Sequence, residues 1–541
     1  GLGLELIKFC DDQSNPPPDI IAGAEVLLQQ LLPVMLRFLA DDYDEISSSV
    51  FPMLSQIFVV YKRAKKNSPQ THLTPAKRAF LLQTLETLLQ KMRWNPDEDP
   101  DDLDDDDRSA FENLRNDLRL FLDSISSIDE ELVASAINTL AMNTLSRADG
   151  TVGWADAELA VYLVYLYGEF QKGDRNRGRL AFITVPEEVA KDKKKHGNWA
   201  EYPLTPHGEM IDALMRSQIS SYPNNTVAIQ YFETVGRYGD FFKIRKQYVE
   251  GVLTTFIDAR GIHHPKESVR RRVFYIFHKF IKDCKTEIPA EYVTTIIDSM
   301  RDVLVVRAEL PEPESSEQDL LSEALGSAGL FDSQLYLFES VGTLVSLLSK
   351  EPERQATVLQ SITNPLLASL QQSIQTPITG PQDILPILQA HHVIRALGSV
   401  SKGFPDVVGA TPVPAPAWVL VLKQVAEAIL LSLEAMNQHR AIRDAARFAF
   451  ARIIASTGSN ITQYIPMLMD RLLRQSQPVE LVDFLAFLSF TVHKLQNEIF
   501  NVLDELISPL STHIFEILAK PVEGTDDRLQ HNDTKKAYLD F

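Results

Sequence analysis

Apolar residues recur along nearly the whole chain at spacings of three and four. Segments of 12–20 residues carry them at positions i, i+3, i+4 and i+7. This spacing places the apolar side chains on one face of an α-helix. Alternating apolar and polar runs bounded by Asn-Gly or Asp-Gly turns, which would indicate hairpins, do not recur. The pattern therefore predicts an all-α protein.

The predicted helices come in pairs that share one plan. Each pair has a first helix, a short polar turn and a second helix, and in two of the pairs the second helix contains Val-Arg or Ile-Arg, at Arg270 and Arg443. We expect this arginine to hydrogen-bond to nearby turns, and Pro33, Pro365 and Pro466 to lie in the first turns of helices. The clearest pairs are residues 31–58, 248–281 and 419–454.

This unit resembles the HEAT repeat. One pair cannot bury its apolar face alone, so neighbouring pairs stack into a solenoid. The pattern thus predicts a HEAT-repeat superhelical solenoid, that is, an α–α superhelix.

The chain has 541 residues, too many for one hydrophobic core, which stops growing at about 250–300 residues. We expect one continuous repeat array over residues 1–541, cut at both ends. The chain starts at Gly1, and the closing DTKKAYLDF stops inside a helix-like pattern. Polar, acidic or Pro-rich composition predicts loops or inserts at residues 95–107, 171–207, 309–328 and 403–418.

Composition narrows the class of protein. Hydrophobic residues make up 45% and charged residues 23%, which is typical of a folded soluble chain. Cys10 and Cys284 are too few for a disulfide framework and indicate a reducing compartment. The best candidate for a membrane span, residues 418–433, is interrupted by polar and charged residues, so we expect no membrane insertion.

The net charge of −20 excludes a uniformly basic coat, but it permits a local basic face, because salt screens charges beyond about 8–10 Å. Residues 261–285 concentrate Lys and Arg. On a helix, the apolar residues from Val269 to Phe280 share one arc. The candidate phosphate-contacting residues lie on or beside the opposite side: Arg271, Arg272, Tyr275, His278, Lys279 and Lys282. The alternative is a solvated face with local ion pairs.

Two further basic clusters have the same two interpretations. Residues 61–78 hold six bases and no acid, and residues 172–196 hold eight bases and four acids. Flexible lysines suit loose phosphate contact, and they equally suit solubility or nuclear localisation. The candidate residues are Lys62, Arg63, Lys65, Lys66, Lys193, Lys194 and Lys195.

The acidic run at residues 97–107 holds nine acids and no base. It cannot contact phosphate. It is either a solvated loop or a contact for a basic partner surface.

Catalytic motifs do not occur. The chain has no P-loop, no GxGxxG after a strand and no HExxH. The pairs His263-His264 and His391-His392 lack metal-ligand spacing, and we expect them at helix ends or in packing. The sequence predicts that the protein is not an enzyme and holds no cofactor.

Several motifs resemble one family closely. Residues 217–246 contain SSY followed by YFETVGRYGDFF, and residues 252–282 contain FIDARGIHH followed by VRRRVFYIFHKFIK. FLADDYDEISSSVFPML and LFDSQLYLFESVGTLV add to these. They resemble exportin-T, the tRNA exportin of the karyopherin-β superfamily, over most of residues 30–400. Tyr231 stands where the family pattern has Phe.

The resemblance implies a carrier that binds mature tRNA together with the GTP form of Ran, contacts nuclear pore proteins and releases tRNA when the GTP is hydrolysed. Ran, not this chain, would hold the GTP. It implies shuttling between nucleus and cytoplasm as a monomer, and that this chain is a middle-to-C-terminal part. Ran-contact candidates are Asp104, Asp105, Asp106 and Asp107. Alternatives are a karyopherin for protein cargo or a HEAT scaffold for a protein complex.

Overall fold

The structure is a computed structural model. It describes residues 1–10, 17–67, 73–98, 100, 102–147, 151–170, 178–191, 198–310, 320–327, 329–380, 383–408, 414–475, 477–521 and 524–541. The chain divides into two compact units, Gly1–Tyr248 and Val249–Phe541.

Both units are built from helices. Helices of the first unit are α1 (Leu2–Cys10), α2 (Pro18–Leu39), α3 (Asp44–Ser48), α4 (Phe51–Asn67), α5 (Pro75–Lys91), α6 (Asp105–Ile128), α7 (Glu130–Leu145), α8 (Trp154–Phe170), α9 (Glu187–Lys191), α10 (Pro206–Arg216), α11 (Asn225–Arg237) and α12 (Gly239–Phe242). A single isolated antiparallel bridge, Ile183 to Leu204, is the β-pairing found in the described residues.

Helices of the second unit are α13 (Val249–Ile257), α14 (Glu267–Cys284), α15 (Ala290–Ser299), α16 (Leu320–Gly326), α17 (Gly329–Ser346), α18 (Pro352–Gln375), α19 (Leu385–Lys402), α20 (Ala417–Met436), α21 (Arg440–Thr457), α22 (Ile465–Arg474), α23 (Leu481–Leu495), α24 (Phe500–Leu518) and α25 (Thr525–Asp540).

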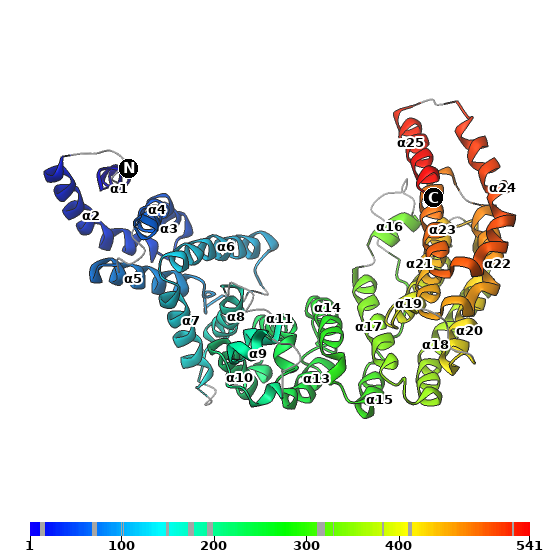
Figure 1. Ribbon diagram of the computed structural model, residues 1–541, viewed down its shortest axis with the longest axis horizontal. Helices are drawn as coiled ribbons and strands as arrows, with labels where there is room; N and C mark the ends of the chain where they lie inside the picture. Colours follow the sequence, from blue (N-terminus) through cyan, green and yellow to red (C-terminus); the bar gives the residue numbers. More distant parts are fainter. Residues whose placement is uncertain are drawn as a thin grey trace. The chain divides into compact units, whose positions relative to one another are not determined.

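Helices of the second unit stack in two rows. In one row α14, α17, α19, α21 and α23 contact each other in succession, and in the other α18, α20 and α22 do (Figure 1). Pairs such as α18–α19 and α20–α21 join the rows. The apolar seam between the rows is the core, with Phe277, Phe338 and Phe450 fully buried. This arrangement is the stacking of helix pairs that the periodicity predicts.

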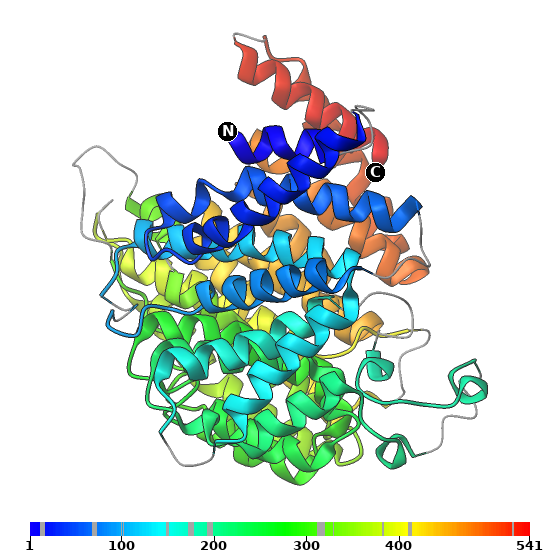
Figure 2. The ribbon, with the colours of Figure 1, turned by 90° about the vertical axis from the view of Figure 1, so that its left-hand side faces the viewer.

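Helices of the first unit stack in the same manner. Figure 2 shows the blue and cyan helices layered one above another. Here α2, α5, α7 and α10 contact each other in succession, while α4 packs on α6 and α8 on α11. A buried ion pair ties α6 to α8: Arg115 makes two hydrogen bonds to Glu158, of 2.9 and 2.6 Å. Sequence-distant helices are therefore joined by polar as well as apolar contacts.

Side-chain caps mark the starts of five α-helices in the described residues. Thr74, Asp104, Asp129, Thr205 and Asn224 each cap a helix by accepting a backbone N–H in its first turn.

The proline predictions were right once in three. Pro466 lies at the start of α22, as expected. Pro33 and Pro365 lie inside α2 and α18, so the expectation that they open helices is wrong. A proline inside a helix removes one backbone hydrogen bond, and these two long helices retain enough other bonds and packing to continue through it.

The inserts proposed from composition are partly helical. Residues 105–107 form the first turn of α6, α9 lies within 171–207, and α16 begins at Leu320. The acids at 105–107 suit a helix start, because the helix dipole favours negative charge there.

By length and composition alone, α2 could cross a bilayer, and 11% of its apolar window is buried. It is the one such helix among the described residues. The sequence expectation had named residues 418–433 as the best candidate and overlooked this helix. In the structure α2 packs against α1 and α5.

Buried His207 makes the first unit sensitive to acid. Its Nε2 lies 3.2 Å from the Val164 carbonyl oxygen, and burial lowers its pKa from 6.5 to about 4. Below pH 6.5 the unfolded chain therefore binds a proton that the folded chain rejects, so stability falls as the pH falls. The loss is about 2 kcal/mol at pH 5 relative to pH 7.

Urea unfolding at pH 7 and pH 5 measures this loss. In the His207→Gln variant that part of the pH dependence should disappear, because glutamine does not titrate. An unchanged pH dependence in the variant would contradict the assignment.

Candidate nucleic-acid interface

The turn before α14 is built by the residues of the FIDARGIHH motif. Asp258 accepts hydrogen bonds from the Arg260 backbone N–H, at 2.8 Å, and from its guanidinium, at 2.6 Å. A Cβ at Gly261 would lie 2.1 Å from the Phe256 carbonyl oxygen, so only glycine fits there. Arg270 then donates to the carbonyls of His264 and Pro265, at 2.7 and 2.9 Å. The motif thus sets where α14 begins, and the expected arginine-to-turn bonds are present.

Helix α14 divides into a buried seam and an exposed basic side. Val269, Val273, Ile276, Phe277 and Phe280 are all buried, as the helical projection predicts. Phe256 of α13 packs against Phe277 and Phe280. This packing fixes the rotation of α14 about its axis, and with it the direction in which the basic side faces.

Four of the six candidates on α14 are exposed: Arg271, Arg272, Tyr275 and Lys282. Arg271 pairs with Glu267 at 2.6 Å, with both side chains about half exposed. The Arg272 guanidinium lies 5.4 Å from the Tyr275 ring centroid. Lys279 is half-buried. The exposed side therefore offers mobile cations and one aromatic ring to solvent.

His278 departs from the prediction. It is buried, 3.3 Å from the Ser340 hydroxyl and 3.6 Å from the Glu339 carboxylate of α17. Burial lowers its pKa. The expectation that it faces solvent is wrong, because α17 covers this side of α14. His278 joins two helices and is not a surface contact.

Two basic residues of α4 donate hydrogen bonds to the neighbouring helix α6. Lys65 donates to the Ile128 carbonyl at the C-terminal end of α6, at 2.5 Å, and Lys62 donates to Ser124 at 3.3 Å. A cation at a helix C-terminus is favoured by the helix dipole. Lys66 is exposed and Arg63 is half-buried with a partner. Lys193, Lys194 and Lys195 lie outside the described residues.

The acidic residues lie beside a groove of about 1110 Å³ in the first unit. Asp104 caps α6 by accepting the Asp107 N–H at 2.8 Å, and Asp106 and Asp107 are exposed. The side chain of Asp105 lies outside the described residues. Acids lining the groove are Asp42, Asp44, Glu86, Asp97, Glu98 and Asp107, against two bases, Lys91 and Arg93. The groove therefore carries a local negative potential.

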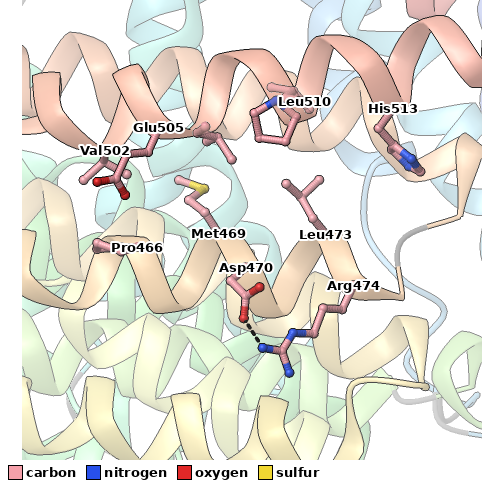
Figure 3. Close-up of a pocket in the computed structure, with 11 residues that line it drawn as sticks. Pro466, Met469, Asp470, Leu473, Arg474, Val502, Glu505, Leu510 and His513 are labelled. Carbon is pink, nitrogen blue, oxygen red and sulfur yellow. Dashed lines mark ion pairs between the residues drawn. The ribbon is translucent and has the colours of Figure 1, made fainter.

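A second groove, of about 490 Å³, runs between α22 and α24. Figure 3 shows Met469 and Leu473 of α22 facing Leu510 of α24, with the Asp470–Arg474 ion pair, 2.6 Å long, beside them. The groove is lined by apolar side chains together with Asp470, Arg474, Glu505 and His513.

A histidine of each pair contacts neighbouring residues of the fold. His392 stacks on Phe331 with centroids 3.8 Å apart, and burial lowers its pKa to about 4. His263 bridges the Ile257 carbonyl and Asp302, both at 2.9 Å. In the part of the chain that the structure describes, no three His, Cys, Asp or Glu side chains are placed to hold a metal ion.

Comparison with known proteins places the chain. The family model Exportin-T matches residues 18–541. The chain is 49% identical to Exportin-T of Laccaria bicolor over 99% of its length, and 47% identical to that of Coprinopsis cinerea over 100%. It is 37% identical to Exportin-T of Mycosarcoma maydis over 100%. The chain spans about half the length of these relatives, 51%, 50% and 51% respectively.

Among solved structures, a chain of the Kap95:Nup1 complex is similar with a TM-score of 0.50 at 11% identity, covering 99% of this chain and 59% of that one. That likeness concerns the fold, and it agrees with the predicted all-α HEAT-repeat solenoid. The match to the family model over nearly all residues, together with relatives of this identity, establishes that the chain belongs to the exportin-T family.

Proposed function

We propose that this chain is part of a nuclear export carrier for mature tRNA, which binds RNA together with the GTP form of Ran and has no catalytic activity. Membership of the exportin-T family supports the carrier role. The full-length protein would shuttle between nucleus and cytoplasm as a monomer and contact nuclear pore proteins on the way.

The observation that carries the RNA part is the exposed side of α14. In a chain of net charge −20, it presents Arg271, Lys282 and Arg272, and the Arg272 guanidinium lies beside the ring of Tyr275. Such a surface contacts phosphates without reading bases, and double-stranded RNA is recognised mainly by its shape and backbone. A carrier for all tRNAs needs recognition of that kind.

The acidic groove beside α6 is the surface that we propose for Ran. Asp107 lines it, and Asp104 and Asp106 adjoin it on the first turn of the helix. A surface with six acids and two bases attracts a basic partner and repels RNA. The proposal thus assigns the two partners to surfaces of opposite sign.

Filter binding of labelled tRNA to the full-length protein, with and without Ran in its GTP form, tests the function. We expect each partner to strengthen binding of the other, because coupling between two sites is reciprocal. No tRNA retention even with saturating Ran would refute the proposal. Binding of protein cargo in its place would favour a protein-carrying karyopherin.

A further inference from the structure

Within one row of helices in the second unit, aromatic and cationic side chains join α14 to α17 and α19 to α21. Tyr275 of α14 meets Tyr336 of α17 edge-on, with centroids 5.2 Å apart, and both rings are more than a third exposed. On α19, the Arg395 guanidinium lies 4.0 Å from the centroid of Phe448 on α21. Helices α14, α17, α19 and α21 follow one another in the same row (Figure 1). The row of helices that carries the basic side of α14 therefore also carries Arg395.

Two arginines share the Phe448 ring of α21. Arg452 lies one helical turn after Phe448, and its guanidinium is 5.6 Å from the ring centroid. Within the described residues neither Arg395 nor Arg452 has an ion-pair partner. The Arg452 Nε is buried and has no hydrogen-bond acceptor.

The electrostatics of this pair are unbalanced. Burial lowers the pKa of Arg395; the charge of Asp332 on α17 raises it, and the charge of Arg452 has a smaller lowering effect. Asp332 is exposed and makes no ion pair with Arg395. Half-buried like charges with an unused donor are costly unless an anion joins them.

We propose that Arg395 and Arg452, both held against Phe448, form a second phosphate-binding subsite for RNA on the same row of helices as α14. This inference rests on the proposed tRNA function. Neighbouring helix axes lie about 8–10 Å apart, so the subsite is about three such steps from α14. One folded RNA backbone can span that distance, whereas a free phosphate ion occupies only one end.

An acidic peptide could satisfy two guanidiniums as well. RNA is the better candidate because the same row of helices carries the exposed bases of α14 and the exposed rings of Tyr275 and Tyr336. Arginine beside an aromatic ring also suits phosphate and base together. Competition by poly-glutamate as strong as that by tRNA would overturn this choice.

The test uses the full-length protein with Arg395→Gln and Arg452→Gln, singly and together, in tRNA filter binding over a series of salt concentrations. We expect about tenfold weaker binding for each substitution and a salt slope lower by about two for the double variant. Arg440→Gln is the matched control. Arg440 is the first residue of α21 and lies about two helical turns before Phe448, away from the ring that the two arginines share, so its slope should not change.

Thermal unfolding separates binding from packing. Because both guanidiniums are half-buried without an ion-pair partner in the described residues, the single variants should unfold at the wild-type temperature or above it while RNA affinity falls. Equal losses of stability and affinity would indicate a structural role and overturn the proposal, as would wild-type affinity and slope in the double variant.

A wild-type protein that fails to bind tRNA would refute the proposed function instead. In that case the existence of the subsite is tested with inorganic pyrophosphate. Pyrophosphate should raise the melting temperature of the wild type and not that of the double variant. Equal shifts in both proteins, or none in either, would overturn the subsite.

Discussion

Glu480→Gln is expected to destabilise the second unit by about 3–5 kcal/mol, the usual cost of removing one member of a buried ion pair. Glu480 and Arg443 are 0% and 1% exposed. The carboxylate accepts two hydrogen bonds from Arg443, at 3.0 and 2.5 Å, and Arg447 lies 3.5 Å away. Without the carboxylate, two cations remain in a poorly hydrated space between α21 and α23.

Urea unfolding, followed by circular dichroism, measures this loss. Asp483→Asn is the matched control, because Asp483 lies in the first turn of α23, three residues after Glu480, is 60% exposed and is 3.8 Å from Arg447 of α21. Its cost should stay below about 1 kcal/mol. Replacing Arg443 and Glu480 together with Met and Leu should recover part of the loss, since no charge is then left unpaired. A loss below 1 kcal/mol for Glu480→Gln would show that the pair is hydrated in solution.

The triple variant Arg271→Glu, Arg272→Glu and Lys282→Glu should weaken binding of every tRNA alike. Each lost phosphate contact lowers the salt slope by about one, so the slope should fall by about three. Arg271 currently pairs with Glu267 at 2.6 Å, but an exposed pair of this kind is worth little and exchanges readily for phosphate. Filter binding with several tRNAs at four or more salt concentrations measures both effects.

The control for this variant reverses three exposed bases elsewhere in the second unit, with the same change in net charge. Arg301 and Arg474 are 51% and 59% exposed, and Lys350 lies in the turn after α17. If this control weakens binding as much as the α14 variant, the effect is one of total charge and the α14 surface is not specific. A loss confined to certain anticodons would contradict backbone recognition.

The helical seam of α14 was predictable from the sequence because it depends only on a period of 3.6 residues. Val273 and Phe277 lie in the core, as that period requires. His278 was placed incorrectly because the period says which residues share a side of the helix but not which side the next helix covers. The sequence did not identify Arg395 and Arg452 as a possible site for the same reason. Nothing in the sequence distinguishes them from other surface arginines, and only the packing of α19 against α21 brings both to the ring of Phe448.

The sequence predicted a structural feature correctly where that feature depends on residues close together in the chain. The turn from Asp258 to Pro265 depends on Gly261, which leaves room for a backbone carbonyl, and on Arg270, which hydrogen-bonds back to the turn. Both residues can be recognised in the sequence. Pro33 was misjudged because a proline tolerated inside a helix looks the same in sequence as one that opens a helix.

The sequence alone was sufficient to predict the all-α class, the paired helices and the exportin-T resemblance. These predictions rest on periodicity, turn chemistry and family motifs, each of which depends on residues close together in the sequence. Pairing of charges across helices was not accessible in this way. Whether Lys65 meets solvent or the end of α6, and whether Arg443 finds Glu480, depends on contacts between residues 63 and 37 positions apart. Such contacts form only when stacked helices exclude water. Burial then makes a charged side chain either pair with a neighbouring group or remain available to bind a ligand.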